Sequence, residues 1–235
     1  MATPAERPWH GAGRRPASAQ SLRPEPVEGR TRIPLTKRAF DVLLSGAGLV
    51  ASAPVWALAA ALIKLEDGGP IFYRQTRVGQ GGRPFEVLKF RSMIPDAEAA
   101  SGKVQSGVDD PRVTRVGRIM RATAMDELPQ LWNIFRGDMS FVGPRALRPG
   151  EIEARAEGRM VRLDTVPGYA RRQQVRPGLT GIAQVYAARD VPARHKFRFD
   201  LVYVRRQSLL LDLKLILVSF WISARGKWEE RGKKF

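Results

Sequence analysis

The stretch VLLSGAGLVASAPVWALAAALIKL, residues 42–65, is the one long apolar run of this chain, and its only charge is Lys64. A helix needs about 20 apolar residues to cross the hydrocarbon core of a bilayer, so this segment is long enough to enter one. Pro54 lies near its middle, where a proline removes one backbone hydrogen bond and clashes with the preceding turn. We therefore expect a kinked membrane helix over residues 35–66.

The flanks of this segment leave two topologies open. One is a bent helix that spans the bilayer, because proline is tolerated in membrane helices. The other is a re-entrant helix that enters one leaflet and returns to the same side. Basic residues stand at both ends, Lys37 and Arg38 before the apolar run and Lys64 and Arg74 after it. This symmetry gives no orientation by the positive-inside rule and favours the re-entrant form.

Residues 1–34 are rich in Pro, Arg, Ala and Gly and carry no apolar periodicity, so we expect a disordered basic tail. A charged region followed by an apolar stretch and a small-residue cleavage site is missing from the start, and no signal peptide is predicted. Because aromatic residues do not interleave with the basic ones, the tail fits a solvated arm beside anionic lipid better than an RNA-binding arm.

The whole chain is long enough, at 235 residues, for one domain with a real core. Its formal net charge of +17 implies an anionic partner, which could be nucleic acid, lipid headgroups or phosphorylated substrates. The absence of cysteine argues against a disulfide framework or a thiolate metal site, and the two histidines, His10 and His195, are too few for a histidine zinc site. Composition does not choose among the anionic partners.

Residues 70–93 alternate short apolar and aromatic runs with glycine turns. They predict a two-stranded hairpin with Gln80, Gly81 and Gly82 in its turn. Lys89 and Arg91 alternate with apolar neighbours, so the two cations share one face of the second strand. That face is either solvated or directed at an anionic site, and the pattern alone favours neither.

The stretch RATAMDELPQLWNIFRGDMSFVGPR, residues 121–145, carries two adjacent carboxylates, Asp126 and Glu127. They precede an apolar-periodic segment that has Pro129 in its first turn and ends at Gly137, which is typical of a short helix. Acidic residues are common at such positions because the helix dipole stabilises them, and the same helix end can receive a phosphate. Both carboxylates stay ionised if cations stand nearby, either the bracketing arginines or a divalent metal.

MDELPQLWNIFRGDMSFVGPR, with KRAFD and GGPIFYRQTRVGQGGRPFEVLKFRSM before it and RPGLTGIAQV after it, resembles the bacterial sugar transferases, the small monotopic phosphoglycosyl transferases. The resemblance runs from Lys37 to the C-terminus. It implies an α+β fold, mostly helical, with a Pro-broken re-entrant membrane helix, a small β-hairpin, and a cytosolic catalytic domain over residues 67–235 that carries interfacial amphipathic helices. The family breaks the membrane helix at Ser-Pro, whereas here Ser52 stands two residues before Pro54.

The resemblance also implies a reaction. A sugar-1-phosphate passes from a UDP-sugar to a polyprenyl phosphate such as undecaprenyl phosphate, with release of UMP, at the cytoplasmic face of the bacterial inner membrane. This would be the first membrane step of exopolysaccharide, O-antigen or glycoprotein glycan assembly. Asp126 would attack phosphorus and hold the sugar phosphate, Glu127 would act as a general base, and both carboxylates would hold Mg²⁺.

Two further groups of residues take roles from the resemblance. The substrate phosphates would be bound by Arg121, Arg145, Lys89 and Arg91. The nucleotide sugar would be held by the loop that contains Arg176, Gly178, Thr180 and Gly181. Without the resemblance, this loop would be an ordinary turn with one arginine, because it has no glycine-rich phosphate-loop signature.

Residues 195–226 carry two amphipathic patterns, FRFDLVYVRRQ and LLLDLKLILVSFWISARGKW. Asp212 and Lys214 interrupt the second apolar run, which makes it a poor spanning segment. We expect a helix that lies in the membrane interface, with Trp221 and Trp228 near the headgroups. An ordinary core helix would show the same amphipathicity.

Two other classes of protein compete with an enzyme. A basic nucleic-acid-binding protein would explain the charge but neither the apolar run nor Asp126 and Glu127, and no known nucleic-acid module is visible. A non-catalytic membrane-associated scaffold would explain only the apolar run. We therefore expect UDP-sugar, polyprenyl phosphate and anionic membrane lipid as partners, and no nucleic acid. The sequence leaves open which sugar is transferred and whether the chain forms a homodimer.

Overall fold

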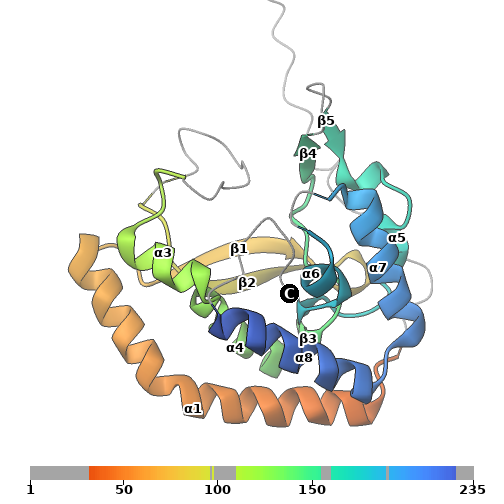
Figure 1. The fold of residues 1–235 in the computed structure, drawn as a ribbon, viewed down its shortest axis with the longest axis horizontal. Coiled ribbons are helices and arrows are strands. Elements are labelled where there is room, and N and C mark those ends of the chain that lie inside the picture. The colour runs from red at the N-terminus through yellow and green to blue at the C-terminus, as the bar shows by residue number, and fades with distance from the viewer. Residues whose placement is uncertain (1–31, 96, 98–109, 155–159, 189–190, 226–235) are drawn as a thin grey trace, which may run out of the picture.

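The computed structural model describes residues 32–95, 97, 110–154, 160–188 and 191–225. Most of the expected N-terminal tail and Trp228 lie outside these residues. Helices and strands mix in one fold, as expected, with a long helix along one side and the other elements gathered on its concave side (Figure 1). In chain order the elements are α1 (Leu35–Asp67), β1 (Phe72–Val78), η2 (Gln80–Gly82), β2 (Pro84–Phe90), α3 (Arg115–Ala122), η3 (Met125–Glu127), α4 (Gln130–Arg136), β3 (Ser140–Val142), β4 (Ile152–Ala154), β5 (Met160–Arg162), η5 (Leu163–Thr165), α5 (Tyr169–Arg172), β6 (Gly178–Thr180), α6 (Ile182–Tyr186), α7 (Ala193–Arg206) and α8 (Leu209–Ala224).

The predicted hairpin is confirmed. β1 and β2 pair antiparallel, with Phe72 opposite Phe90 and Val78 opposite Pro84. The turn contains Gly81 and Gly82 with φ angles of 67° and 75°, which glycine adopts without the cost that a side chain would impose.

A second, parallel pair joins β3 to β6, with Ser140 opposite Gly178. The two backbones approach very closely here, since a Cβ added to Gly178 would lie 2.0 Å from the backbone nitrogen of Gly143. A Cβ added to Gly181 would lie 2.3 Å from the Gly143 carbonyl oxygen. The glycines of the RPGLTG loop therefore have a packing role that the sequence pattern did not reveal.

The core lies where α4, β3, α7 and α8 meet. Its interior side chains lose almost all contact with solvent, which is the main source of stabilisation in a fold of this size. The fully buried members are Tyr203, Ile134, Met139, Leu215, Ile222, Val142 and Val185.

Helix α1 runs without interruption through Pro54 and curves along its length (Figure 1). The hydroxyl of Ser52 accepts a hydrogen bond from Trp56 Nε1 at 3.0 Å and lies 3.5 Å from the Leu49 carbonyl oxygen. Within the described residues, α1 is the one helix whose length and composition would allow it to cross a membrane. The predicted membrane segment is therefore one curved helix, and it is not divided into two helices at Pro54.

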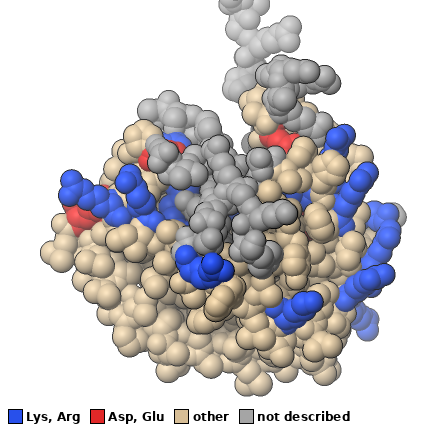
Figure 2. All heavy atoms as spheres, in the orientation of Figure 1, with Lys and Arg blue, Asp and Glu red and all other residues tan. Residues whose placement is uncertain are grey.

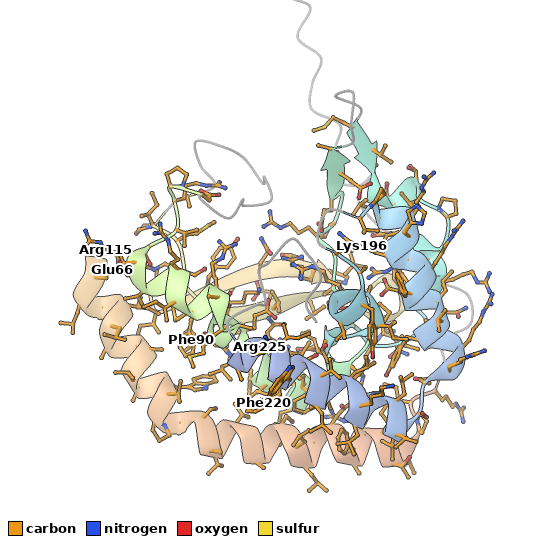
Figure 3. The ribbon with its side chains drawn as sticks, viewed as in Figure 1. Glu66, Phe90, Arg115, Lys196, Phe220 and Arg225 are labelled. Carbon is orange, nitrogen blue, oxygen red and sulfur yellow. The ribbon has the colours of Figure 1, made fainter. Side chains whose placement is uncertain are left out.

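Both ends of α1 are bonded to the rest of the molecule. At the start, Lys37 Nζ lies 2.6 Å from Asp212 Oδ2 of α8. Near the end, Glu66 Oε1 accepts the backbone N–H of Arg115 at 2.6 Å, where α3 begins (Figure 3). Between these points Gly48 packs against Leu131, and an added Cβ would lie 3.2 Å from Leu131 Cδ1. The helix is thus part of the folded body along its length.

Helix α8 does not have the amphipathic division that was predicted, because its exposed face is largely apolar too and its buried face carries an aspartate. Asp212, Leu215 and Ile222 are buried, whereas Leu217 and Phe220 are exposed. The structure explains the aspartate within this apolar run, because Asp212 also accepts a hydrogen bond from the Tyr203 hydroxyl at 2.8 Å. The buried face of α8 thus carries a polar bond to the start of α1.

Candidate active site

The acidic pair lies in η3, between α3 and α4. Thr114 caps the start of α3, where its hydroxyl accepts the N–H of Gly117 at 2.9 Å. After α3 the chain turns at Ala124, whose φ of 57° is the one positive value at a non-glycine among the described residues. A left-handed conformation costs an ordinary residue about 1–2 kcal/mol. The turn sets Asp126 into the body of the protein, with 8% of its surface exposed.

The helix predicted after the pair is confirmed as α4. Pro129 stands just before it, and Gly137 ends it with a φ of 100° that favours glycine. Asp126 and Glu127 occupy their own short turn one step earlier, so they stand before the first turn of α4.

Lys89 makes direct ionic contacts with the acidic pair. Its Nζ is 2.5 Å from Glu127 Oε1 and 3.9 Å from Asp126 Oδ2. The side chains of Lys89, Asp126 and Glu127 are about one fifth exposed or less, so water screens these charges only in part. Of the two possibilities that the strand pattern left open for Lys89, the structure shows the one in which it faces an acidic site.

The charges around Glu127 keep it ionised at neutral pH. Burial raises the pKa of this carboxyl, but Lys89, then Arg145 and Arg77, lower it by more, and the pKa falls below its ordinary value of 4.5. Arg145 is therefore close enough to act on Glu127, as expected of a bracketing arginine, and its binding of substrate phosphate stays a prediction.

Arg77 was not found from the sequence. It is buried on β1, and burial followed by repulsion from Arg145 lowers its pKa to about 10. Its Nη1 donates to the Ala146 carbonyl oxygen at 2.9 Å. Sequence pattern does not distinguish Arg77 from Arg74 or Arg83 in the same hairpin; only its burial in the folded protein does. Lys89, Arg145 and Arg77 form a cationic group around the two carboxylates, which suits a substrate with several negative charges.

Arg91 does not share the surroundings of Lys89. Its guanidinium binds both carboxylate oxygens of Asp67, with Nη1 at 2.6 Å from Oδ2. It also donates to the carbonyl oxygens of Pro70 at 2.6 Å and Met93 at 3.0 Å. Four of its donor positions are thus used to hold the end of α1 to the hairpin. Strand alternation predicted only that Arg91 shares a face with Lys89, but β2 ends at Phe90, one residue earlier. Its phosphate-binding role, which the resemblance implied, stays a prediction.

Arg121 lies in the last turn of α3. Its charge adds to the lowering of the Asp110 pKa to about 2, for which a hydrogen bond from Arg112 is the main cause. The structure thus relates Arg121 to the segment before α3. Its role at substrate phosphate stays a prediction.

The predicted nucleotide-sugar loop lies against β3 and α8. The Thr180 hydroxyl hydrogen-bonds Ser219 of α8, and a β-bridge joins Gly178 to Arg145. The Arg176 guanidinium lies beside Gly137, 3.3 Å from where its Cβ would be. This loop therefore supports the segment that carries Arg145, and its direct contact with a nucleotide sugar stays a prediction.

The acidic pair can supply part of a metal site. Among the described residues, no group of three or more His, Cys, Asp and Glu side chains could hold a metal ion. Mg²⁺ is commonly bound through one or two carboxylates, with substrate phosphates and water as its other ligands. Asp126 and Glu127 fit that pattern as adjacent oxygen donors, although Lys89 already binds one oxygen of Glu127.

The comparisons with known proteins agree on one protein family. Residues 32–226 match the family model described as bacterial sugar transferase. The chain is 44% identical over 185 residues to the exopolysaccharide production protein PSS of Rhizobium leguminosarum bv. phaseoli, covering 77% of this chain and 90% of that protein. It is 44% identical over 202 residues to a UDP-glucose:undecaprenyl-phosphate glucose-1-phosphate transferase of Caulobacter vibrioides, covering 84% and 73%.

A third relative, from Escherichia coli K12, bears the same name as the Caulobacter protein and is 38% identical over 199 residues, or 83% of this chain and 41% of that protein. The matched residues 32–226 include α1, the hairpin, the acidic pair and the RPGLTG loop. The chain belongs to the bacterial sugar transferase family and is a phosphoglycosyl transferase.

Proposed function

We propose that this enzyme transfers a sugar-1-phosphate from a UDP-sugar to a polyprenyl phosphate, in bacteria undecaprenyl phosphate, through a phosphosugar covalently held on Asp126. The observation that carries the proposal is the group of Lys89, Arg145 and Arg77 around the two adjacent carboxylates. The names of the Caulobacter and Escherichia relatives support these substrates.

The reaction has two displacements. In the first, an Asp126 carboxylate oxygen forms a bond to the phosphorus nearer the sugar, the bond from that phosphorus to the bridging oxygen breaks, and UMP leaves. In the second, a phosphate oxygen of the polyprenyl phosphate attacks the same phosphorus and Asp126 departs as a carboxylate. Two steps with a carboxylate nucleophile replace one difficult displacement.

The cations are suited to hold the diphosphate during both steps. Phosphoryl transfer depends mostly on positioning and on stabilising charge, and arginine forks match phosphate oxygens in a way that lysine does not. Arg145 is exposed and can reach a substrate, whereas Arg77 is buried. Lys89 compensates the negative charge of the acidic pair, so that a polyanionic donor can approach.

Glu127 is suited to a role in which its carboxylate stays ionised. Its lowered pKa means that it rarely holds a proton at neutral pH. This favours orientation of Lys89 and metal ligation over strong general-base action, although a lipid phosphate that arrives protonated would still meet an acceptor there. Bound Mg²⁺ would neutralise the diphosphate and the departing UMP, with Asp126 and Glu127 as its protein ligands.

The attachment of α1 supports a re-entrant membrane segment. Lys37 at its start and Glu66 at its end both bind residues of the same catalytic body. A helix that spans the bilayer would place its two ends on opposite sides of the membrane, whereas these contacts favour a position of both ends on the side of the catalytic body. We therefore assign both ends to the cytoplasmic side of the bacterial inner membrane, where the UDP-sugar is found.

The surface fits this orientation. The lower face of the molecule, along α1, carries almost no charged side chains in Figure 2, and Phe220 of α8 is exposed (Figure 3). Exposed apolar side chains such as Leu43 and Val50 of α1 and Leu217 of α8 would enter the lipid. The net charge of +17 would add attraction to anionic lipid.

The chemical proposal is tested by UMP release. The purified protein in detergent is given a panel of UDP-sugars, beginning with UDP-glucose, with and without polyprenyl phosphate. UMP release and a sugar-phosphate mass adduct on Asp126 are expected for the right donor. Asp126→Asn should abolish both, whereas the matched exchange Asp164→Asn, at an ion-paired surface residue, should change neither. Release at the wild-type rate from Asp126→Asn would exclude Asp126 as the nucleophile.

The topology is tested by single cysteines in this cysteine-free chain. Leu35 and Leu65 are 87% and 83% exposed at the two ends of α1 and accept a substitution without loss of packing. In sealed, oriented vesicles, a membrane-impermeant maleimide should label Leu35→Cys and Leu65→Cys from the same side. Labelling from opposite sides would show a spanning helix.

A further inference from the structure

A pocket of about 630 Å³ opens between α5 and α7, on the side of the molecule away from α1. Three arginines line it: Arg171 of α5, and Arg194 and Arg198 of α7. Arg194 and Arg198 are four residues apart on one helix and therefore share a face. Figure 2 shows basic side chains gathered along this edge of the molecule. We call this cavity the α5–α7 pocket.

The charge of the three arginines is not compensated within the described part of the chain, because none of them forms an ion pair with a carboxylate there. Arg194 Nε contacts His195 Nε2 at 3.2 Å, and an imidazole carries no negative charge. Like charges held together at one surface repel, and an anion between them would remove that repulsion.

The acidic groups nearby are already bound. Asp164 binds Arg162 at 2.6 Å, and Asp200 of α7 binds Arg172 at 2.8 Å. A third carboxylate, Glu153, accepts the N–H of Ala193 at 2.6 Å, where α7 begins. Each of these three carboxylates thus binds another group, and the lining of the pocket among the described residues contains arginine but no acidic residue.

The rest of the lining is apolar. Val161, Val166 and Leu201 form part of the wall below the arginines. The volume lies within the range of about 300–1,000 Å³ that is usual for small-molecule sites. Guanidinium forks match phosphate oxygens, and apolar side chains pack against a ring or a hydrocarbon body. Size, charge and lining together select a phosphate ester that carries a ring or an apolar group.

From these observations we infer that the α5–α7 pocket is a second anion-binding site, which takes a phosphate ester with a ring or apolar body and is separate from the acidic pair. The lining of the pocket includes none of Asp126, Glu127, Lys89, Arg145 and Arg77. A soluble nucleotide and a lipid headgroup share the required chemistry, and the experiment below separates them.

Arg172, which does not line the pocket, connects its surroundings to the segment that carries Arg145. Arg172, next to Arg171, binds Asp200 of α7 and also donates to the Arg145 carbonyl oxygen at 2.6 Å through Nη2. Ligand binding in the pocket and the rate of UMP release can therefore be measured on the same variants. The inference itself concerns binding and does not depend on the transferase reaction.

The test is titration calorimetry of the full chain in detergent with AMP, a phosphate ester with a ring that the proposed reaction neither uses nor releases. Arg194→Ala/Arg198→Ala should weaken AMP binding at least tenfold at constant ionic strength. The control, Arg205→Ala/Arg206→Ala, removes the same charge from exposed positions of the same helix outside the pocket and should leave binding unchanged. Melting temperatures check that both variants fold.

Two outcomes would overturn the inference, and two others identify the kind of ligand. Equal weakening in both variants would show attraction to net charge only and would overturn it, as would unchanged binding in the pocket variant. If vesicles that contain anionic lipid displace AMP from the wild-type protein but zwitterionic vesicles do not, a lipid headgroup is the ligand. If neither displaces it, a soluble phosphate ester is. UMP release by the pocket variant, measured in parallel, separates a failure of this inference from a failure of the proposed reaction.

Discussion

Replacement of Lys37 by Met should markedly lower the free energy of unfolding of the detergent-solubilised protein. Lys37 Nζ lies 2.6 Å from Asp212 Oδ2, and the two side chains are only 9% and 0% exposed. Removal of one partner from a buried ion pair costs about 3–5 kcal/mol, because the other charge stays out of water without compensation. A domain of about 150–250 residues loses about 2–4 °C of melting temperature per kcal/mol, so we expect a loss of roughly 6–20 °C.

The assay is a double-mutant cycle followed by thermal unfolding. Asp212→Leu alone leaves Lys37 buried without its partner, whereas the double variant Lys37→Met/Asp212→Leu replaces the pair with apolar side chains. The Tyr203 hydroxyl then keeps a second acceptor, the Val142 carbonyl oxygen at 2.9 Å. The double variant should therefore melt closer to the wild type than either single variant does.

The matched control is Lys214→Met, which changes an exposed lysine on the same helix as Asp212 and should leave the melting temperature nearly unchanged. Two results would refute the reasoning. One is a Lys37→Met variant that melts within about 2 °C of the wild type, less than a 1 kcal/mol loss would give. The other is a double variant whose loss equals the sum of the single losses.

Three further predictions concern the active-site side of the molecule. Lys89→Met should move the acidic limb of kcat/KM to higher pH: burial already raises the pKa of Glu127, and loss of the lysine charge lets that effect prevail. In the wild type, the contribution of ionised Glu127 to the free energy of unfolding is complete above its ordinary pKa of 4.5 and is lost as the pH falls through the lowered pKa. An acidic limb of kcat/KM at the same pH in the variant and the wild type would contradict this account. Glu66→Ala should cost about 0.5–2 kcal/mol in chemical unfolding, because the first N–H groups of α3 lose their acceptor, whereas the exposed Glu86→Ala should cost much less. Ala124→Gly should raise stability by about 1 kcal/mol as the left-handed turn is relieved, and a lower denaturant midpoint would show that Ala124 is not strained.

The parts of the fold that sequence pattern predicted well depend on local signals. Gly81 and Gly82 specify the hairpin turn, because the turn needs positive φ angles. Gly137 ends α4 with a positive φ angle as well, and Pro129 marks its start because proline is favoured there. Asp212 of α8 was interpreted from the sequence as a sign that the helix lies at the membrane interface. Its partner, Lys37, is far away in the sequence, so no local pattern indicates that the two side chains form an ion pair.

The parts of the candidate site that were missed depend on tertiary contacts. Arg91 was grouped with Lys89 by strand alternation, but Asp67, 24 positions earlier, binds its guanidinium. Arg77 acts on Glu127 from another strand and looks like any other hairpin arginine in the sequence. A strand pattern gives the face on which a side chain leaves the backbone but not the distant residue that it meets.

The bonds at the two ends of α1 have a consequence for how this protein can change. A generic membrane anchor cannot replace residues 35–67, because the exchange would take away the cation beside Asp212 and the carboxylate that caps α3 in one step. Anchor and catalyst must therefore be inherited, grafted or redesigned as a single piece. Chimeras within the family that exchange both together should stay active, and those joined just after Asp67 should lose activity even when they reach the membrane.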